Sequence, residues 1–145
     1  QEASMTFRET LTKIADRYGL SEMYAFGSRA AEAAARLHGA PGPQRAAQSD
    51  LDIGVRPVPG ERLGARERAR LCAELEDLFA ASRVDLVLLP EADPFLALDV
   101  IRGELLYARD LDAEAEYELY VLRRAGDLAP FARERWEQVL KEGGA

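Results

Sequence analysis

The sequence predicts an α/β protein of the α+β type, with a small mixed sheet whose helices pack on one side and with C-terminal helices after it. Short apolar runs of strand length alternate with segments whose apolar residues recur at helical spacing. Of the 145 residues, 48% are hydrophobic and 31% charged, which suits a packed core under a charged surface. This length favours one domain at 5–145, with a core at 5–110 and C-terminal helices at 111–141. "QEAS" before Met5 is interpreted as a remnant outside the fold.

The first part of the chain is expected to run helix, strand, tight turn, helix. Thr6 and Glu9 have the spacing of a capping box ahead of an apolar stripe, which predicts a first helix ending near Gly19. "EMYAF" at 22–26 indicates a short buried strand that runs into a Gly-Ser turn. The alanine-rich "RAAEAAARL" at 29–37 strongly favours a helix.

The middle of the chain predicts two further strands around a helix. "DLDIGV" at 50–55 alternates apolar and acidic residues, so both of its aspartates leave a strand on the same side. Apolar residues between 71 and 79 recur at helical spacing. "RVDLVLLP" at 83–90 supplies an apolar strand that Pro90 closes.

The last part of the chain predicts a helix, a strand and then two helices. "PFLALDVIRG" at 94–103 begins with proline and ends with glycine, as helices often do, and "ELLYA" indicates a final strand. One terminal helix is expected from Asp112 to Gly126, because acidic residues open it and arginines precede the glycine. A second is expected from about Pro130 to Lys141.

Composition excludes several classes of protein. The net charge of −7 repels polyanions, so direct nucleic-acid binding is not expected. No apolar run reaches the length of a membrane span, and the lone Cys72 cannot form an internal disulfide, which together predict a cytoplasmic protein. Cys72 is expected to be a small buried apolar group, and His38, the single histidine, a solvated loop residue.

Gly27 and Ser28 predict an anion site. A Gly-Ser step between a strand and a helix turns the backbone tightly and points N–H groups, backed by the helix dipole, at whatever lies in front. The Ser28 hydroxyl adds a further donor for a phosphate oxygen. The alternative is that Ser28 only caps the helix.

Asp50, Asp52 and Asp85 predict a metal site. Two like charges leaving one strand face are unfavourable unless a cation or solvent separates them, and a wet acidic edge strand is the alternative. Asp85 lies within an apolar strand, where a buried carboxylate adds nothing to packing. Three carboxylates on neighbouring strands suit two magnesium ions.

The anion site and the metal site together describe nucleotidyl transfer from a triphosphate. Two metal ions can activate an attacking hydroxyl and stabilise the departing pyrophosphate. Asp50 and Asp52 are assigned to both metals, and Asp85 to the metal beside the acceptor, with a role as base. Gly27 and Ser28 are assigned to the β- and γ-phosphates.

The order G-S, D-x-D and a later strand carboxylate resembles the nucleotidyltransferase superfamily of DNA polymerase beta. The matching residues are Gly27, Ser28, Asp50, Asp52 and Asp85. The resemblance implies the polymerase-beta-like fold, and the small size resembles the minimal nucleotidyltransferases (MNT proteins). The stretch between Ser28 and Asp50 is longer than the family motif implies. One interpretation is a longer helix plus an exposed loop that leaves the strands in register, and the alternative is an insertion that disturbs nucleotide entry.

The resemblance also implies a substrate and a partner. MNT proteins commonly accompany a HEPN-type ribonuclease toxin, so the chain is expected to be an antitoxin that transfers AMP from ATP to a toxin tyrosine in a hetero-oligomer. One alternative is an antitoxin that neutralises its toxin by binding alone, which Mg-dependent ATP affinity would argue against. The other is a small-molecule enzyme resembling aminoglycoside nucleotidyltransferases, which generally needs an additional domain or a dimer partner.

Other side chains are candidates for supporting roles. Three arginines before the D-x-D strand are within reach of a triphosphate on sequence grounds. Aromatic residues of the C-terminal helices favour core packing over partner docking. These two sets are Arg29, Arg36 and Arg45, and Tyr117, Tyr120, Phe131 and Trp136.

Overall fold

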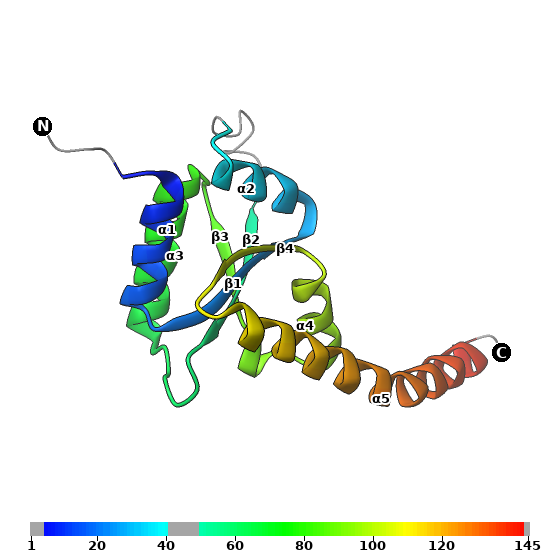
Figure 1. The fold of residues 1–145 in the computed structure, drawn as a ribbon. Helices are drawn as coiled ribbons and strands as arrows, with labels where there is room; N and C mark the ends of the chain where they lie inside the picture. The colour runs from blue at the N-terminus through cyan, green and yellow to red at the C-terminus, as the bar shows by residue number, and fades with distance from the viewer. Residues whose placement is uncertain (1–4, 41–49, 144–145) are drawn as a thin grey trace, which may run out of the picture.

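The computed structural model describes residues 5–40 and 50–143 and contains every strand that the sequence predicts (Figure 1). The mixed α/β fold class is therefore confirmed. In chain order the elements are α1 (Phe7–Arg17), β1 (Leu20–Phe26), the 3-10 turn η1 (Gly27–Arg29), α2 (Ala30–Leu37), β2 (Leu51–Pro57), α3 (Ala65–Phe79), β3 (Val84–Leu88), the 3-10 turn η2 (Leu89–Glu91), α4 (Pro94–Ile101), β4 (Glu104–Ala108) and α5 (Leu111–Gly143).

The four strands form one mixed sheet in the order β3-β2-β1-β4. β1 is antiparallel to both β2 and β4, whereas β2 and β3 are parallel. A parallel pair needs a crossover connection, and α3 supplies it. The sheet therefore has two edge strands, β3 and β4, and at one end of the sheet the end of β1 lies beside the starts of β2 and β3.

One face of the sheet is covered by α1, α2 and α3. The larger core cluster joins these helices to alternate residues of the strands, among them Met23, Ile53 and Val84. Burial of these apolar side chains stabilises the fold by about 1.5–3 kcal/mol each. This face agrees with the prediction that helices pack behind the sheet.

The other face, expected to be open, is partly covered by α4 and α5. Tyr24 and Val100 are fully buried in a second core cluster on this side, and Tyr117 of α5 packs against it. Helix α4 comes close because β2 has Gly54 here: a Cβ at that position would lie 2.4 Å from Cγ1 of Val100. Apolar residues on both faces of β1 require helices on both faces, so the expectation of helices on one side is wrong in this respect.

The C-terminal segment is one helix rather than the two expected. α5 runs through Gly126 and Pro130, and its second half extends away from the sheet (Figure 1). A glycine within a helix costs only about 1 kcal/mol. Pro130 is exposed, so the backbone groups it disturbs can bond to water. Although α5 has 33 residues, neither it nor any other described helix has the apolar stretch that a membrane span needs.

Candidate active site

The Gly-Ser turn lies where β1 passes into α2, as predicted. Gly27 has φ of +77°, a left-handed conformation that favours glycine, and both Gly27 and Ser28 are exposed. Neither η1 nor α2 has a side-chain hydrogen bond at its start. No capping bond therefore supports the alternative that Ser28 only caps the helix.

The sheet brings Asp52 and Asp85 side by side. They are register partners on the parallel strands β2 and β3, and neighbouring strands lie about 4.8 Å apart. On its other side Asp52 pairs with Phe26, the last residue of β1. The turn at Gly27 therefore begins next to this pair of carboxylates, and residues from three strands meet at one end of the sheet.

Gly27 packs directly against Asp52. A Cβ on Gly27 would lie 2.6 Å from Oδ2 of Asp52, closer than carbon and oxygen can approach. The glycine is required both by its φ and by this contact. The predicted anion site and the predicted metal-binding carboxylate are thus in van der Waals contact.

The charge state of Asp52 reflects this arrangement. Burial raises the pKa of its carboxyl above the ordinary value, and the nearby charges of Asp85 and Asp50 raise it further. Each of these effects disfavours the ionised form. A bound cation would oppose them, so oxygen donors under mutual repulsion suit a hard divalent ion such as Mg²⁺.

Asp50 is not drawn into the pair. It precedes the first residue of β2, is exposed and is not held by the strand ladder. Within residues 5–40 and 50–143, no three Asp, Glu, His or Cys side chains come close enough to hold a metal ion. The structure therefore brings together Asp52 and Asp85, and the assignment of Asp50 to the metals stays a prediction.

Asp85 has a basic neighbour. Nε of Arg83 lies 3.2 Å from Oδ1 of Asp85, and both side chains are largely exposed to solvent, at 69% and 41%. Ion pairs this exposed contribute about 0–1 kcal/mol and exchange readily with other partners. Asp85 is thus accessible to a ligand.

Substituting Gly27 with alanine should impair nucleotide binding through Asp52. Gly60 is the matched control, because its φ is +90° and a Cβ there would meet nothing within 4 Å. Both Gly27→Ala and Gly60→Ala should lose about 1–2 kcal/mol of stability from the left-handed backbone. Mg-ATP is expected to raise the melting temperature of the parent and of Gly60→Ala but not that of Gly27→Ala. An equal increase in the two variants would contradict a role for the Gly27–Asp52 contact.

The three arginines that are candidates for contact with a triphosphate differ in their positions. Arg29 is buried beside the turn and pairs with Glu32 at 3.1 Å. Arg36 instead lies 4.7 Å from the ring centroid of Phe7 and donates to the Leu78 carbonyl, so it is directed toward α1 and α3 rather than toward a triphosphate. Arg45 lies outside the described residues.

The other single residues largely follow expectation. His38 is exposed at the end of α2, as predicted. Cys72 is only half-buried at the rim of the larger core, so the expectation that it is buried is correct in part. Among the aromatic residues, the side chains of Phe131 and Trp136 lie outside the described part of the chain.

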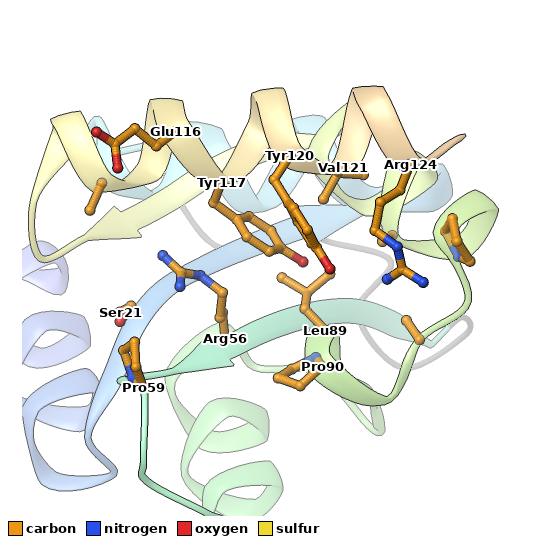
Figure 2. A pocket seen from close by; sticks show the side chains of 14 residues that line it. Ser21, Arg56, Pro59, Leu89, Pro90, Glu116, Tyr117, Tyr120, Val121 and Arg124 are labelled. Carbon is orange, nitrogen blue, oxygen red and sulfur yellow. The ribbon is translucent and has the colours of Figure 1, made fainter. Parts of the chain in front are cut away.

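A cavity of 640 Å³ lies between α5 and the segment from η2 to α4 (Figure 2). Tyr117 and Tyr120 point into it from α5, above Leu89 and Pro90. The guanidinium of Arg56 lies 4.5 Å from the Tyr117 ring centroid. Tyr117 belongs to the second core, as predicted, whereas Tyr120 is 53% exposed and lines the cavity.

The anchor of α5 is a buried polar network that the sequence analysis missed. Glu22, 1% exposed, accepts two hydrogen bonds from Arg56, at 2.5 and 2.7 Å. Tyr24 donates to buried Glu114 of α5 at 2.6 Å. The sequence does contain a signal for this network, because Glu22 and Arg56 each lie within an apolar strand. A charge at a buried strand position is tolerated only when it is paired.

Comparisons with known proteins agree with this geometry. The family model for polymerase beta, nucleotidyltransferase, matches residues 9–112. A search of curated proteins found no match.

Three solved structures share the fold. A chain from a mutant MntA–HpeT toxin–antitoxin complex has a TM-score of 0.67 at 20% identity, covering 92% of this chain and 98% of that one. A chain from a toxin–antitoxin with AMP-PNP has 0.65 at 21%, covering 92% and 98%. A chain from the tri-AMPylated Shewanella oneidensis HEPN toxin in complex with MNT antitoxin has 0.65 at 18%, covering 92% and 96%.

The family match extends from α1 to the start of α5 and includes the Gly-Ser turn and both paired carboxylates. The order of these features along the chain and their meeting at one end of the sheet agree with it. The chain belongs to the polymerase beta nucleotidyltransferase family.

Proposed function

We propose that the chain transfers AMP from ATP to a tyrosine hydroxyl of a HEPN-type toxin, with Mg²⁺ as cofactor. The observation that carries the proposal is the contact of the Gly27 turn with Asp52 beside Asp85, in a chain of this family. Structures with the same fold include a complex with AMP-PNP and a tri-AMPylated toxin, which supports ATP as the donor and a protein as the acceptor.

Each residue has a role in binding or proton transfer. The N–H groups of the exposed residues Gly27 and Ser28 bind the β- and γ-phosphates at the start of α2. Asp52, with Asp50 and Asp85, would hold Mg²⁺, which supplies charge neutralisation at the triphosphate when bound. The Asp85 side chain is 41% exposed and accepts the proton of the acceptor hydroxyl.

The transfer needs no reactant besides ATP and the acceptor hydroxyl. The acceptor oxygen forms a bond to the α-phosphorus of ATP, and the bond from that phosphorus to the bridging oxygen of pyrophosphate breaks. The hydroxyl proton passes to the Asp85 carboxylate and from there to solvent. Pyrophosphate leaves past the exposed Gly27–Ser28 turn.

Incubation with the cognate HEPN protein and Mg-ATP should add about 329 Da per transferred AMP to the toxin. Intact-mass spectrometry measures the addition, and a ribonuclease assay should show the toxin silenced. Asp85→Asn, which keeps the shape of the side chain but cannot accept the proton, is the control and should leave the toxin unmodified. A toxin that stays unmodified by the parent chain yet is inhibited in a stable complex would reject transfer in favour of inhibition by binding.

A further inference from the structure

Strand β3 forms an edge of the sheet beside the candidate active site. It pairs with β2 on one side, and no described strand lies on the other. The Leu51 N–H donates to the Arg83 carbonyl at 3.0 Å, which fixes the direction of the backbone groups. Because N–H and C=O of one residue point the same way in a parallel strand, those of residues 84, 86 and 88 point outward. The outer edge of β3 thus offers backbone donors and acceptors at regular spacing.

The start of this edge is covered by a side chain. Glu76 of α3 accepts a hydrogen bond from the Val84 N–H at 3.0 Å. Beyond it, Leu86 presents both its N–H and its C=O outward. Exposed edge strands are usually covered, charged or interrupted because they readily pair with other chains. Among the residues that the structure describes, a side chain accepts a hydrogen bond only from the first outward N–H, that of Val84, so the edge from Leu86 onward is suited to pairing.

The edge is the floor of a groove of 490 Å³. Helix α3 forms one wall and the segment from η2 to α4 forms the other, on the two faces of the sheet. Asp85 of the candidate active site lies in the groove. The wall residues are Arg68, Ala69 and Cys72 on one side and Glu91, Ala92 and Leu96 on the other.

The groove has a defined course. Asp85 lies near one end, just after Arg83 and Val84. At the other end Arg68 of α3 forms an ion pair with Glu91 of η2 at 2.7 Å, which joins the two walls. Ala92 lines both this groove and the cavity under Tyr117 and Tyr120 shown in Figure 2. A ligand along β3 therefore leads from the carboxylates toward an aromatic cavity.

We propose that the outer edge of β3 binds an extended segment of the protein acceptor as an added strand, with the acceptor hydroxyl beside Asp85. The inference rests on the proposed function and names how that site takes its second substrate. Backbone pairing at a sheet edge is a common mode of peptide recognition and suits any sequence, with side-chain pockets adding specificity. A small-molecule acceptor would have no use for these repeated backbone groups.

The dimensions fit such a segment. The five residues of β3 span about 16 Å, the length of five residues of an extended peptide. In an added strand, the residue opposite Asp85 places its side chain on the same face of the sheet as Asp85. That is the face on which Asp52 lies, so an acceptor hydroxyl there reaches both carboxylates.

Filling the groove should block the acceptor and spare the nucleotide. Ala69 is exposed in the α3 wall, and Ala73, one turn further on, is equally exposed but outside the groove. Ala69→Trp should slow modification of the HEPN protein at least tenfold, whereas Ala73→Trp should modify it at the parent rate. Both variants should keep the parent's increase in melting temperature with Mg-ATP. Parent-like modification by Ala69→Trp would overturn the inference.

Hydrogen exchange separates failure of this inference from failure of the proposed function. The Leu86 and Leu88 amides should exchange quickly in the chain alone and at least tenfold more slowly in its complex with the HEPN protein, while the Val55 amide of central strand β2 stays slow in both. Transfer without this protection would overturn the inference and leave the proposed function standing. Protection in a complex that shows no transfer would reject the proposed function and support the added strand. Absence of both complex and transfer would contradict both.

Discussion

Asp52→Asn is expected to abolish nucleotidyl transfer without destabilising the fold. The change removes a carboxylate from the site that would hold Mg²⁺. Substituting even a residue that only supports a metal ligand typically lowers metal affinity or activity 10–100-fold, so the transfer rate is expected to fall at least about 100-fold. Transfer is measured as the mass added to the HEPN protein. Mg-ATP should raise the melting temperature of the parent but not that of Asp52→Asn.

The same substitution has a defined effect on the pH dependence of stability. The pKa of Asp52 is raised in the folded protein. In the pH window between the ordinary aspartate pKa of about 4 and this raised pKa, the folded state therefore binds more protons than the unfolded state. The parent therefore loses stability as the pH rises through this window, and Asp52→Asn does not.

Melting curves with metal-free protein check this relation. At pH 7 Asp52→Asn should melt at the parent temperature or above it, and the difference should vanish as the pH falls below about 4. Asp77→Asn is a suitable control, since this exposed carboxylate lies on α3, behind the sheet, and has no ion pair with another described residue. A lower melting temperature for Asp52→Asn at pH 7 would show that its carboxylate stabilises the fold and would contradict the assignment.

Arg56→Met should destabilise the protein by about 3–5 kcal/mol, the typical cost of leaving a buried charge unpaired. Arg56 makes both hydrogen bonds to Glu22, which is 1% exposed, and its guanidinium lies over the Tyr117 ring of α5. Removal of the guanidinium leaves a buried carboxylate without a cation. Chemical denaturation at pH 7 measures the loss.

The double variant Glu22→Gln with Arg56→Met separates the charge from the packing. It should recover most of the lost stability, because no buried charge remains. The single variant should also regain stability in acid, since burial raises the pKa of an unpaired carboxyl and protonation then favours the folded state. If the double variant is as unstable as the single one, the stacking on Tyr117 rather than the ion pair holds α5 in place.

The strands and the position of the turn were predictable because they depend on local patterns. Alternation in "DLDIGV" places Asp52 on the face opposite Ile53, and the structure confirms this. The Gly-Ser step between strand and helix was likewise visible in the order of residues. Both features involve neighbours in the chain, where side-chain period and backbone preference decide the outcome.

The features that were not predicted depend on contacts between distant segments. The position of α4 on the second face follows from Gly54 meeting Val100, which no local pattern shows. The length of α5 was missed because Gly126 and Pro130 are ordinary signals for a helix end. The position of Asp50 outside the carboxylate pair depends on β2 beginning one residue later, at Leu51.

The pairing of Phe26 with Asp52 has a consequence for how such chains can diverge. Hydrogen bonds between β1 and β2 set the spacing of turn and carboxylate, so the chain that connects α2 to β2 does not. Closing a connection of twice the length costs only about 0.6 kcal/mol. A change in the length of that connection is therefore expected to leave the spacing of the turn and the carboxylate unchanged.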